Sequence, residues 1–308
     1  MYFPYFRGRQ YELLALKELA LGRLISSSVI PVVEPVKLIP ALNNSLAAFS
    51  KSELPISLIL NPNVGDLAEE AETIDQLIDR FCTDQAIIPS VLLNESTEAV
   101  VSKLAQKGLA NKDVLAVLDN RDYLDIYCAL FGEDSPRFTL CPDERLIRRK
   151  VKKSKILFDD RFNKQNRNAD YPEDEFFSDN HLDLESDNYV GFGDYSIVGR
   201  EYIESGFAPY AVAIHIVYFA DDSSLRIKHF VSDSNDDISD VAGKFYEAVT
   251  KLYNWYVHGQ EKQLTSGLQI LLDHYKNQTY PGLPTLKKLS IMHHLELVGN
   301  YLDGRLKI

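Results

Sequence analysis

The sequence has few cysteines, and none of them are paired in a motif. The 308 residues include three, Cys82, Cys128 and Cys141, and no CxxC pair occurs among them. Cysteine-based zinc sites use closely spaced thiols, so the wide spacing of these three cysteines argues against this class of site. An odd, sparse set of thiols is typical of buried core cysteines in a reducing compartment.

Long apolar runs are also absent. Runs such as Ala211–Ala220 are far shorter than the roughly 20 residues of a membrane helix, and this one contains His215. The segment Met1–Gln10 is aromatic, carries Arg7 and Arg9, and lacks the apolar centre of a signal peptide. We therefore expect a cytoplasmic protein with no membrane segment.

Several motifs of common enzyme classes do not occur. No GxGxxG follows the first predicted strand, and GxxxxGK[ST], GxSxG and HExxH are all missing. These absences argue against a dinucleotide-binding Rossmann domain, a P-loop NTPase, a serine hydrolase of the nucleophile-elbow type and a zincin.

Basic residues are fewer than acidic ones. Lysine and arginine number 33 against 45 aspartates and glutamates, so the formal net charge is 33 − 45 = −12. We expect no strong binding to duplex nucleic acid, because such binding needs clustered basic residues. One basic segment, Arg145–Lys155, could attract a phosphate group, but we interpret it as a solvated helix face.

Strand-like and helix-like segments alternate along the first 232 residues. The predicted strands are Val29–Val33, Ile56–Leu60, Ala86–Leu93, Val114–Leu118, Arg137–Cys141, Lys155–Phe158, Tyr189–Phe192 and Ala211–Phe219. A polar turn at Asp221–Ser224 then predicts a hairpin return along Leu225–Val231. Alternation of this kind indicates parallel pairing through helical crossovers. We predict an α/β fold, a TIM-like (β/α)8 barrel over residues 1–232, with an open doubly wound α/β sheet as the alternative.

The remaining residues, 233–308, have a wholly helical pattern. The predicted helices are Ile238–Val257, Glu261–Tyr275 and Pro284–Leu302. Apolar residues recur at helical spacing in the first of them, so we expect this C-terminal helical extension to pack on the barrel.

Polar side chains follow the predicted strands directly. These residues are Glu34, Asn61, Asn94, Asp119, Asp159, Asp160 and Asp194. The carboxyl ends of the strands of a parallel barrel meet at one rim, and carboxylates are ligands that Mg²⁺ and Mn²⁺ prefer. We predict that Glu34, Asp159 and Asp194 hold a divalent cation, Mg²⁺ or Mn²⁺. For any one position the alternative is an ordinary turn residue.

Acid–base and substrate-binding residues are predicted from the same positions. His215, Asp160 and Asp194 are the candidate catalytic acids or bases. A buried, hydrogen-bonded histidine is the alternative for His215. Gly191 and Gly193 would let the backbone approach a ligand. The predicted contacts to an anionic substrate are Arg7, Lys37, Asn61, Arg167, Asp170 and Tyr195.

Seven stretches spread over nearly the whole chain resemble an uncharacterised bacterial family of about this length. They are Met1–Gln10 (MYFPYFRGRQ), Glu34–Val36, Asn61–Pro62, Arg167–Tyr171 (RNADY), Gly191–Tyr195 (GFGDY), His229–Ser232 and Lys287–Glu296 (KKLSIMHHLE). More distantly, the chain is similar to the Beta protein family of phages and bacteria. The resemblance implies a TIM-barrel-like fold and gene neighbourhoods of mobile elements or phage defence, but no assigned reaction.

Two functions remain open at this stage. The first is a metal-assisted hydrolase or lyase that acts on an anionic, phosphoester-like small molecule. The second is a non-catalytic protein that binds a partner protein, such as a neighbouring nuclease. Tyr253, Trp255 and Tyr256 in the helical extension are the candidate contacts for such a partner.

Overall fold

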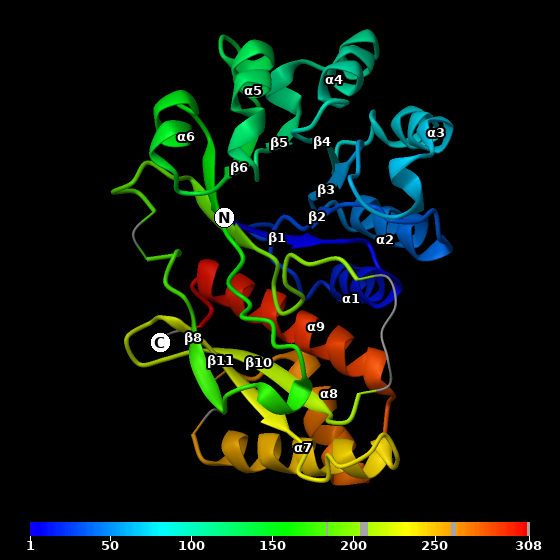
Figure 1. Cartoon of the computed structure of the whole chain (residues 1–308), viewed down its shortest axis with the longest axis vertical. Coiled ribbons are helices and arrows are strands. Elements are labelled where there is room, and N and C mark those ends of the chain that lie inside the picture. Colours follow the sequence, from blue (N-terminus) through cyan, green and yellow to red (C-terminus); the bar gives the residue numbers. More distant parts are fainter. Residues whose placement is uncertain (183, 204–208, 260–262, 307–308) are drawn as a thin grey trace.

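The computed structural model describes residues 1–182, 184–203, 209–259 and 263–306 (Figure 1). Within these ranges, eight parallel strands close into a barrel in the order β1-β2-β3-β4-β5-β6-β7-β9. Their bounds are β1 Tyr2–Phe6, β2 Val32–Val33, β3 Ile56–Ile59, β4 Ile87–Leu92, β5 Leu115–Val117, β6 Phe138–Cys141, β7 Lys155–Phe158 and β9 Gly191–Asp194. The predicted TIM-like barrel is confirmed, and its closure excludes the open sheet.

Helices connect successive strands and cover the outside of the barrel. They are α1 Gln10–Leu21, α2 Pro40–Ser52, α3 Ala71–Phe81, α4 Thr97–Gln106, α5 Leu124–Phe131 and α6 Arg145–Lys150. In α3 the buried residues Ile74, Leu77, Ile78 and Phe81 recur at helical spacing and form the face that packs on the strands. In α6 the basic residues are exposed, as expected of a solvated helix face, whereas Lys155 at the end of the same basic segment is buried in β7.

The first strand of the barrel is one that the sequence analysis does not predict. β1 has the sequence YFPYF and pairs in parallel with both β2 and β9, with Tyr5 beside Val32 and Pro4 beside Asp194. Proline lacks the N–H group that a central strand normally donates, so its presence argues against a strand here. The five fully buried side chains of β1 show how strongly burial outweighs that preference.

The predicted eighth barrel strand, Ala211–Phe219, was wrong. Its residues lie in β10 (Ala213–Phe219), which pairs antiparallel with β11 (Leu225–Val231), and β11 pairs antiparallel with β8 (Asp174–Ser178). The predicted hairpin is confirmed, and it is the reason for the error. The tight turn fixes antiparallel pairing, whereas the gap between β7 and β1 needs a parallel strand and is filled by β9. We call β8, β10 and β11 the accessory sheet.

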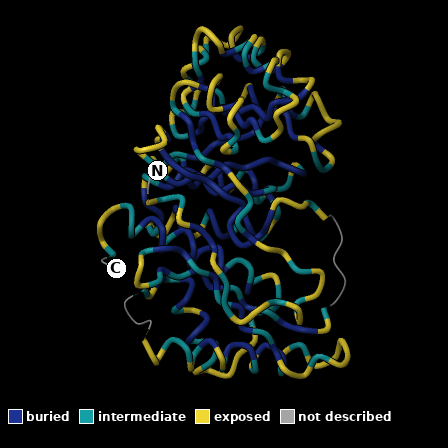
Figure 2. Tube along the Cα trace, turned by 60° about the vertical axis from the view of Figure 1, so that its left-hand side comes forward, coloured by how far each residue is buried: buried dark blue, intermediate teal, exposed yellow. Residues whose placement is uncertain are grey.

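The predicted helical tail is confirmed as α7 (Val241–Val257), α8 (Ser266–Asn277) and α9 (Leu283–Leu302). The expected start of the second helix, at 261–262, lies outside the described residues. Helix α9 packs between α1 of the barrel and β10 of the accessory sheet, and α7 packs on that sheet and on α8 rather than on the barrel (Figure 1). Buried segments therefore run through the middle of the molecule, as Figure 2 shows.

None of the helices in the described part of the chain is both long enough and apolar enough to cross a membrane.

Candidate functional site at the carboxyl end of the barrel

The alternation of side chains along each strand decides which polar residues reach the barrel mouth. The barrel interior is mostly apolar, apart from the hydrogen-bonded pair Ser57 and Ser90, and residues on it alternate with residues that face the helices. The last interior residues of six strands are Tyr5, Val32, Ile59, Leu92, Val117 and Phe158. Two positions beyond them, on the same face, come Arg7, Glu34, Asn61, Asn94, Asp119 and Asp160. These six residues form the polar rim that we call the mouth.

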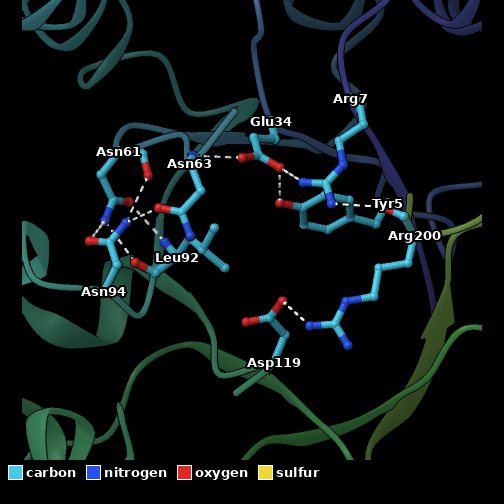
Figure 3. A network of polar contacts seen from close by, with 9 residues as sticks. All are labelled: Tyr5, Arg7, Glu34, Asn61, Asn63, Leu92, Asn94, Asp119 and Arg200. Carbon is cyan, nitrogen blue, oxygen red and sulfur yellow. Dashed lines mark hydrogen bonds and ion pairs between the residues drawn. The ribbon is translucent and has the colours of Figure 1, made fainter. Parts of the chain in front are cut away.

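Glu34 is the most buried charged group of the mouth. Its Oε2 accepts a hydrogen bond of 2.7 Å from the Tyr5 hydroxyl and forms an ion pair with Arg7. Its Oε1 accepts a hydrogen bond of 2.8 Å from the backbone N–H of Asn63 (Figure 3). A carboxylate removed from water needs such donors, because burying it unpaired costs a large free energy. Glu34 is thereby fixed in position and in turn fixes Arg7.

The guanidinium group of Arg7 has a defined orientation. Its Nη2 donates to the backbone carbonyl of Arg200 at 2.9 Å, and its central carbon lies 5.3 Å from the Tyr5 ring and 5.8 Å from the Tyr195 ring. The side chain is 11% exposed. Its Nε is buried and makes no hydrogen bond within the described ranges, a cost of about 1–3 kcal/mol that native proteins seldom retain without a function.

Three asparagines line the opposite part of the mouth. Asn61 binds the backbone of Leu92 in both directions, with Oδ1 accepting at 2.8 Å and Nδ2 donating at 2.7 Å, and it also donates to Asn94 at 2.9 Å. Asn94 in turn donates to Oδ1 of Asn63. Asn61, a predicted substrate contact, therefore uses its polar atoms to join β3 to β4. Asn63 is exposed, and its Nδ2 makes no hydrogen bond to the part of the chain that the structure describes.

Arg200 closes the mouth from the segment that follows β9. Its Nη2 lies 3.1 Å from Oδ2 of Asp119, in an ion pair whose side chains are 53% and 21% exposed. Its backbone is held on both sides, since the N–H donates to Asp160 at 2.8 Å and the carbonyl accepts from Arg7. Burial raises the pKa of Asp160. Arg200 is not among the residues predicted from the sequence, and the signal for it is its place shortly after the last barrel strand.

The three predicted metal ligands are not brought together. Alternation turns Asp159 and Asp194 away from the interior, whereas Glu34 points into the mouth. Asp159 is half exposed and lies 3.5 Å from Arg161. Among the described residues, no group of three or more histidine, cysteine, aspartate or glutamate side chains is placed to hold a metal ion. The donor set therefore does not fit the predicted Mg²⁺ or Mn²⁺.

Asp194 lies on the outer surface of the barrel. Its Oδ1 accepts hydrogen bonds of 2.7 Å from the Tyr2 hydroxyl and from the backbone N–H of Ser196. Burial raises the pKa of Asp194 to about 7, even though both hydrogen bonds favour the charged form. The contacts of this carboxylate thus connect elements of the fold rather than face the mouth.

The other predicted residues lie in three places. Tyr195 is buried beneath Arg7, with its ring 5.1 Å from that of Tyr5. Lys37 is on the surface, 3.4 Å from Asp66. Arg167 and Asp170 are exposed, the first just before the short 3-10 helix Asn168–Asp170 and the second at its end, and His215 is in β10 of the accessory sheet. The structure therefore separates Arg167, Asp170 and His215 from the mouth.

Gly191 and Gly193 make room for the first strand. A Cβ atom at these positions would lie 2.6 Å from the carbonyl oxygen of Met1 and 2.5 Å from that of Phe3. Such distances are far below ordinary contact. The close backbone approach that the sequence analysis expects for a ligand is instead the approach of β1, which closes the barrel.

Comparisons with known proteins assign no relative to the chain. No family model matches it, and no curated protein or solved structure does either. The barrel is the part of the resemblance to the Beta protein family that the structure supports.

Proposed function

We propose that the mouth binds a small anionic molecule through Arg200 and Arg7, without a metal ion. The observation that carries this proposal is the exposed Arg200–Asp119 ion pair on a segment whose backbone is fixed by Arg7 and Asp160. Ligands of (β/α)8 barrels bind at this end of the strands, which supports the choice of place.

Arg200 can exchange its partner at little cost. An exposed ion pair contributes only about 0.2–1 kcal/mol, because water and salt screen it. A carboxylate or phosphate offers the guanidinium two parallel hydrogen bonds and so competes well with Asp119. The Asp119 carboxylate would then be free to accept a proton or a hydrogen bond from the ligand.

The rest of the mouth supports the same ligand. Arg7 is oriented in advance by Glu34 and by two aromatic rings, so little conformational entropy is lost when it meets an anion. Nδ2 of Asn63, which has no partner among the described residues, adds a neutral donor. In an acid–base hydrolase or lyase, Asp119 and Asp160 would be the catalytic carboxylates. For the metal-assisted form of that activity, the described residues form no group of three metal-binding side chains.

A thermal-shift titration tests the proposal. Wild-type protein is heated with inorganic phosphate, pyrophosphate or benzoate at millimolar concentration, beside Arg200→Gln and the control Arg149→Gln, which removes an exposed arginine of α6. We expect at least one anion to raise the Tm of the wild type and of Arg149→Gln but not of Arg200→Gln. Equal shifts in all three proteins, or none in the wild type, would contradict the proposal.

The partner-binding alternative gains no support from the aromatic residues that suggest it. Tyr253 stacks on Tyr275 with ring centres 4.2 Å apart, and Trp255 packs edge-on against Tyr218 at 5.3 Å. Both side chains are half-buried within the molecule. A nuclease partner and a role in phage defence therefore rest on the family resemblance and stay predictions.

A further inference from the structure

A cavity lies outside the mouth, between the accessory sheet, α9 and the segments that follow β7 and β9. Its volume is about 330 Å³, within the range of small-molecule sites. One wall is apolar, formed by Ile197, Val198, Leu283 and Leu286. The polar lining, after which we name it the His215 cavity, includes Lys164, Asn168, Tyr171, His215, Lys287 and Ser290.

Two histidines lie side by side on neighbouring strands of the accessory sheet. His215 of β10 and His229 of β11 are directly opposite in the antiparallel register, so their side chains share one face of the sheet. Their Nδ1 atoms are 2.7 Å apart, and Nε2 of His229 lies 3.0 Å from Oε1 of Glu175. The rings are held in place, since Tyr171 stacks on His229 at 4.7 Å and Phe162 meets His215 edge-on at 5.3 Å.

This chain of contacts determines where the protons sit. Burial, followed by the charges of His229 and Lys287, keeps the pKa of His215 well below 6.5, and burial also lowers that of His229. Both rings are therefore neutral at pH 7, with one N–H each. A carboxylate accepts hydrogen bonds, so His229 donates from Nε2 to Glu175 and accepts at Nδ1. His215 must then donate from Nδ1, which leaves the lone pair on its Nε2.

The lone pair on Nε2 of His215 and the amine of Lys287 belong to the lining of the same cavity. Nε2 of His215 makes no hydrogen bond to the described residues, and the side chain lines the cavity. Lys287 of α9 lines the same cavity, is half-buried, and forms neither an ion pair nor a hydrogen bond within the described ranges. Burial lowers the pKa of Lys287, and the opposing effect of the nearby Glu12 charge is smaller. An anion in the cavity would give the Lys287 ammonium group a direct partner.

We propose that the His215 cavity binds a small organic anion that carries a hydroxyl group. Lys287 contacts the anionic oxygens, Nε2 of His215 accepts the hydroxyl hydrogen bond, and the apolar wall covers the hydrocarbon part of the ligand. Lys164 lines the same cavity and adds positive charge, and its partner within the described ranges is the exposed Glu201 at 3.3 Å. This site is separate from the mouth and does not depend on the function proposed there.

The proton positions are tested first, on wild-type protein labelled with ¹⁵N-histidine. Long-range ¹H–¹⁵N spectra distinguish a protonated ring nitrogen from an unprotonated one. We expect Nε2 of His215 to be unprotonated and Nδ1 to carry the proton at pH 7. A protonated Nε2 would overturn the proposal, because the cavity would then offer no acceptor at this position.

Ligand binding is tested with a matched pair of probes, 2-hydroxyisocaproate and isocaproate, which differ by the hydroxyl group. We expect the hydroxy acid to shift the His215 Nε2 signal at millimolar concentration and to bind up to about tenfold more tightly than isocaproate. Lys287→Met should abolish this response. Lys288→Met is the control, because the neighbouring lysine points to Glu18 of α1 at 2.7 Å. An unchanged His215 signal in the wild type, or an equal response in both variants, would overturn the proposal.

Discussion

The hydroxyl of Tyr2 donates a hydrogen bond of 2.7 Å to Oδ1 of Asp194 and so joins the first strand of the barrel to the last. The bond lies on the outer surface, and both residues are buried. Ser196 donates to the same oxygen through its backbone, and its Oγ lies 2.9 Å from Nδ1 of His294 in α9. Asp194 therefore connects barrel closure to the helix that separates the barrel from the accessory sheet.

Because Asp194 is buried, its titration makes the free energy of unfolding depend on pH. Asp194 has a pKa of about 7 in the folded protein against 3.8 when unperturbed, so the folded state binds its proton more tightly. The resulting stabilisation is fully present below about pH 4 and is lost as the pH rises through about 7, by at most about 1.4 kcal/mol per pH unit. We expect Asp194→Asn to remove this loss, because an amide oxygen still accepts from Tyr2 but does not titrate.

The measurement is urea unfolding of both proteins at about pH 5 and about pH 8. Asp194→Asn should gain stability relative to the wild type at the higher pH. Asp159→Asn, which changes a half-exposed carboxylate, should follow the wild type. A variant that is much less stable at both pH values would show that the charge of Asp194 is required.

Two substitutions at the mouth should lower the free energy of unfolding by different amounts. Glu34→Gln leaves Arg7 with a buried, unpaired charge, and we expect the free energy of unfolding to fall by about 3–5 kcal/mol. Asp119→Asn breaks an exposed pair and should cost less than about 1 kcal/mol. Denaturant unfolding measures both values, and similar values for the two variants would contradict the described burial.

Gly193→Ala should prevent proper barrel closure. The new methyl group would lie 2.5 Å from the backbone oxygen of Phe3, which cannot move without breaking the pairing of β1 with β9. We expect a loss of about 3 kcal/mol or more, or insoluble protein. Gly108→Ala is the control, since its Cβ has open space and only the positive φ of +86° opposes it, at about 1 kcal/mol.

Divalent cations should leave the protein unaffected. Because Glu34, Asp159 and Asp194 are not brought together, we expect the same Tm in MgCl₂, MnCl₂ and EDTA. Differential scanning calorimetry checks this result. A saturable rise in Tm with either metal would show a carboxylate site that the described residues do not form.

Strand positions and the barrel could be read from the sequence because apolar runs alternate with amphipathic helices. The alternation of side chains along the strands also indicates which residues reach the mouth. Counting two residues on from the interior side chain Val32 gives Glu34, whereas the same count from Phe158 gives Asp160 and not Asp159. The predicted carboxylate cluster ignored this rule and so combined residues from two faces.

Other features depend on tertiary structure and could not be predicted from local patterns. β1 contains a proline, and its role as a barrel strand follows only from burial on both faces. His215 and His229 are 14 residues apart, but their pairing with Glu175 requires the register of the three-stranded sheet. Arg200 is placed by backbone bonds to Arg7 and Asp160, which are far from it in the sequence.

The central claim is that an anion replaces Asp119 as the partner of Arg200, and isothermal titration with pyrophosphate tests it most directly. If Asp119 competes with the ligand, Asp119→Asn should bind up to about fivefold more tightly than the wild type, the equivalent of a ~1 kcal/mol surface pair. Arg200→Gln should show no binding. Unchanged affinity in both variants, or weaker binding in Asp119→Asn, would contradict the claim.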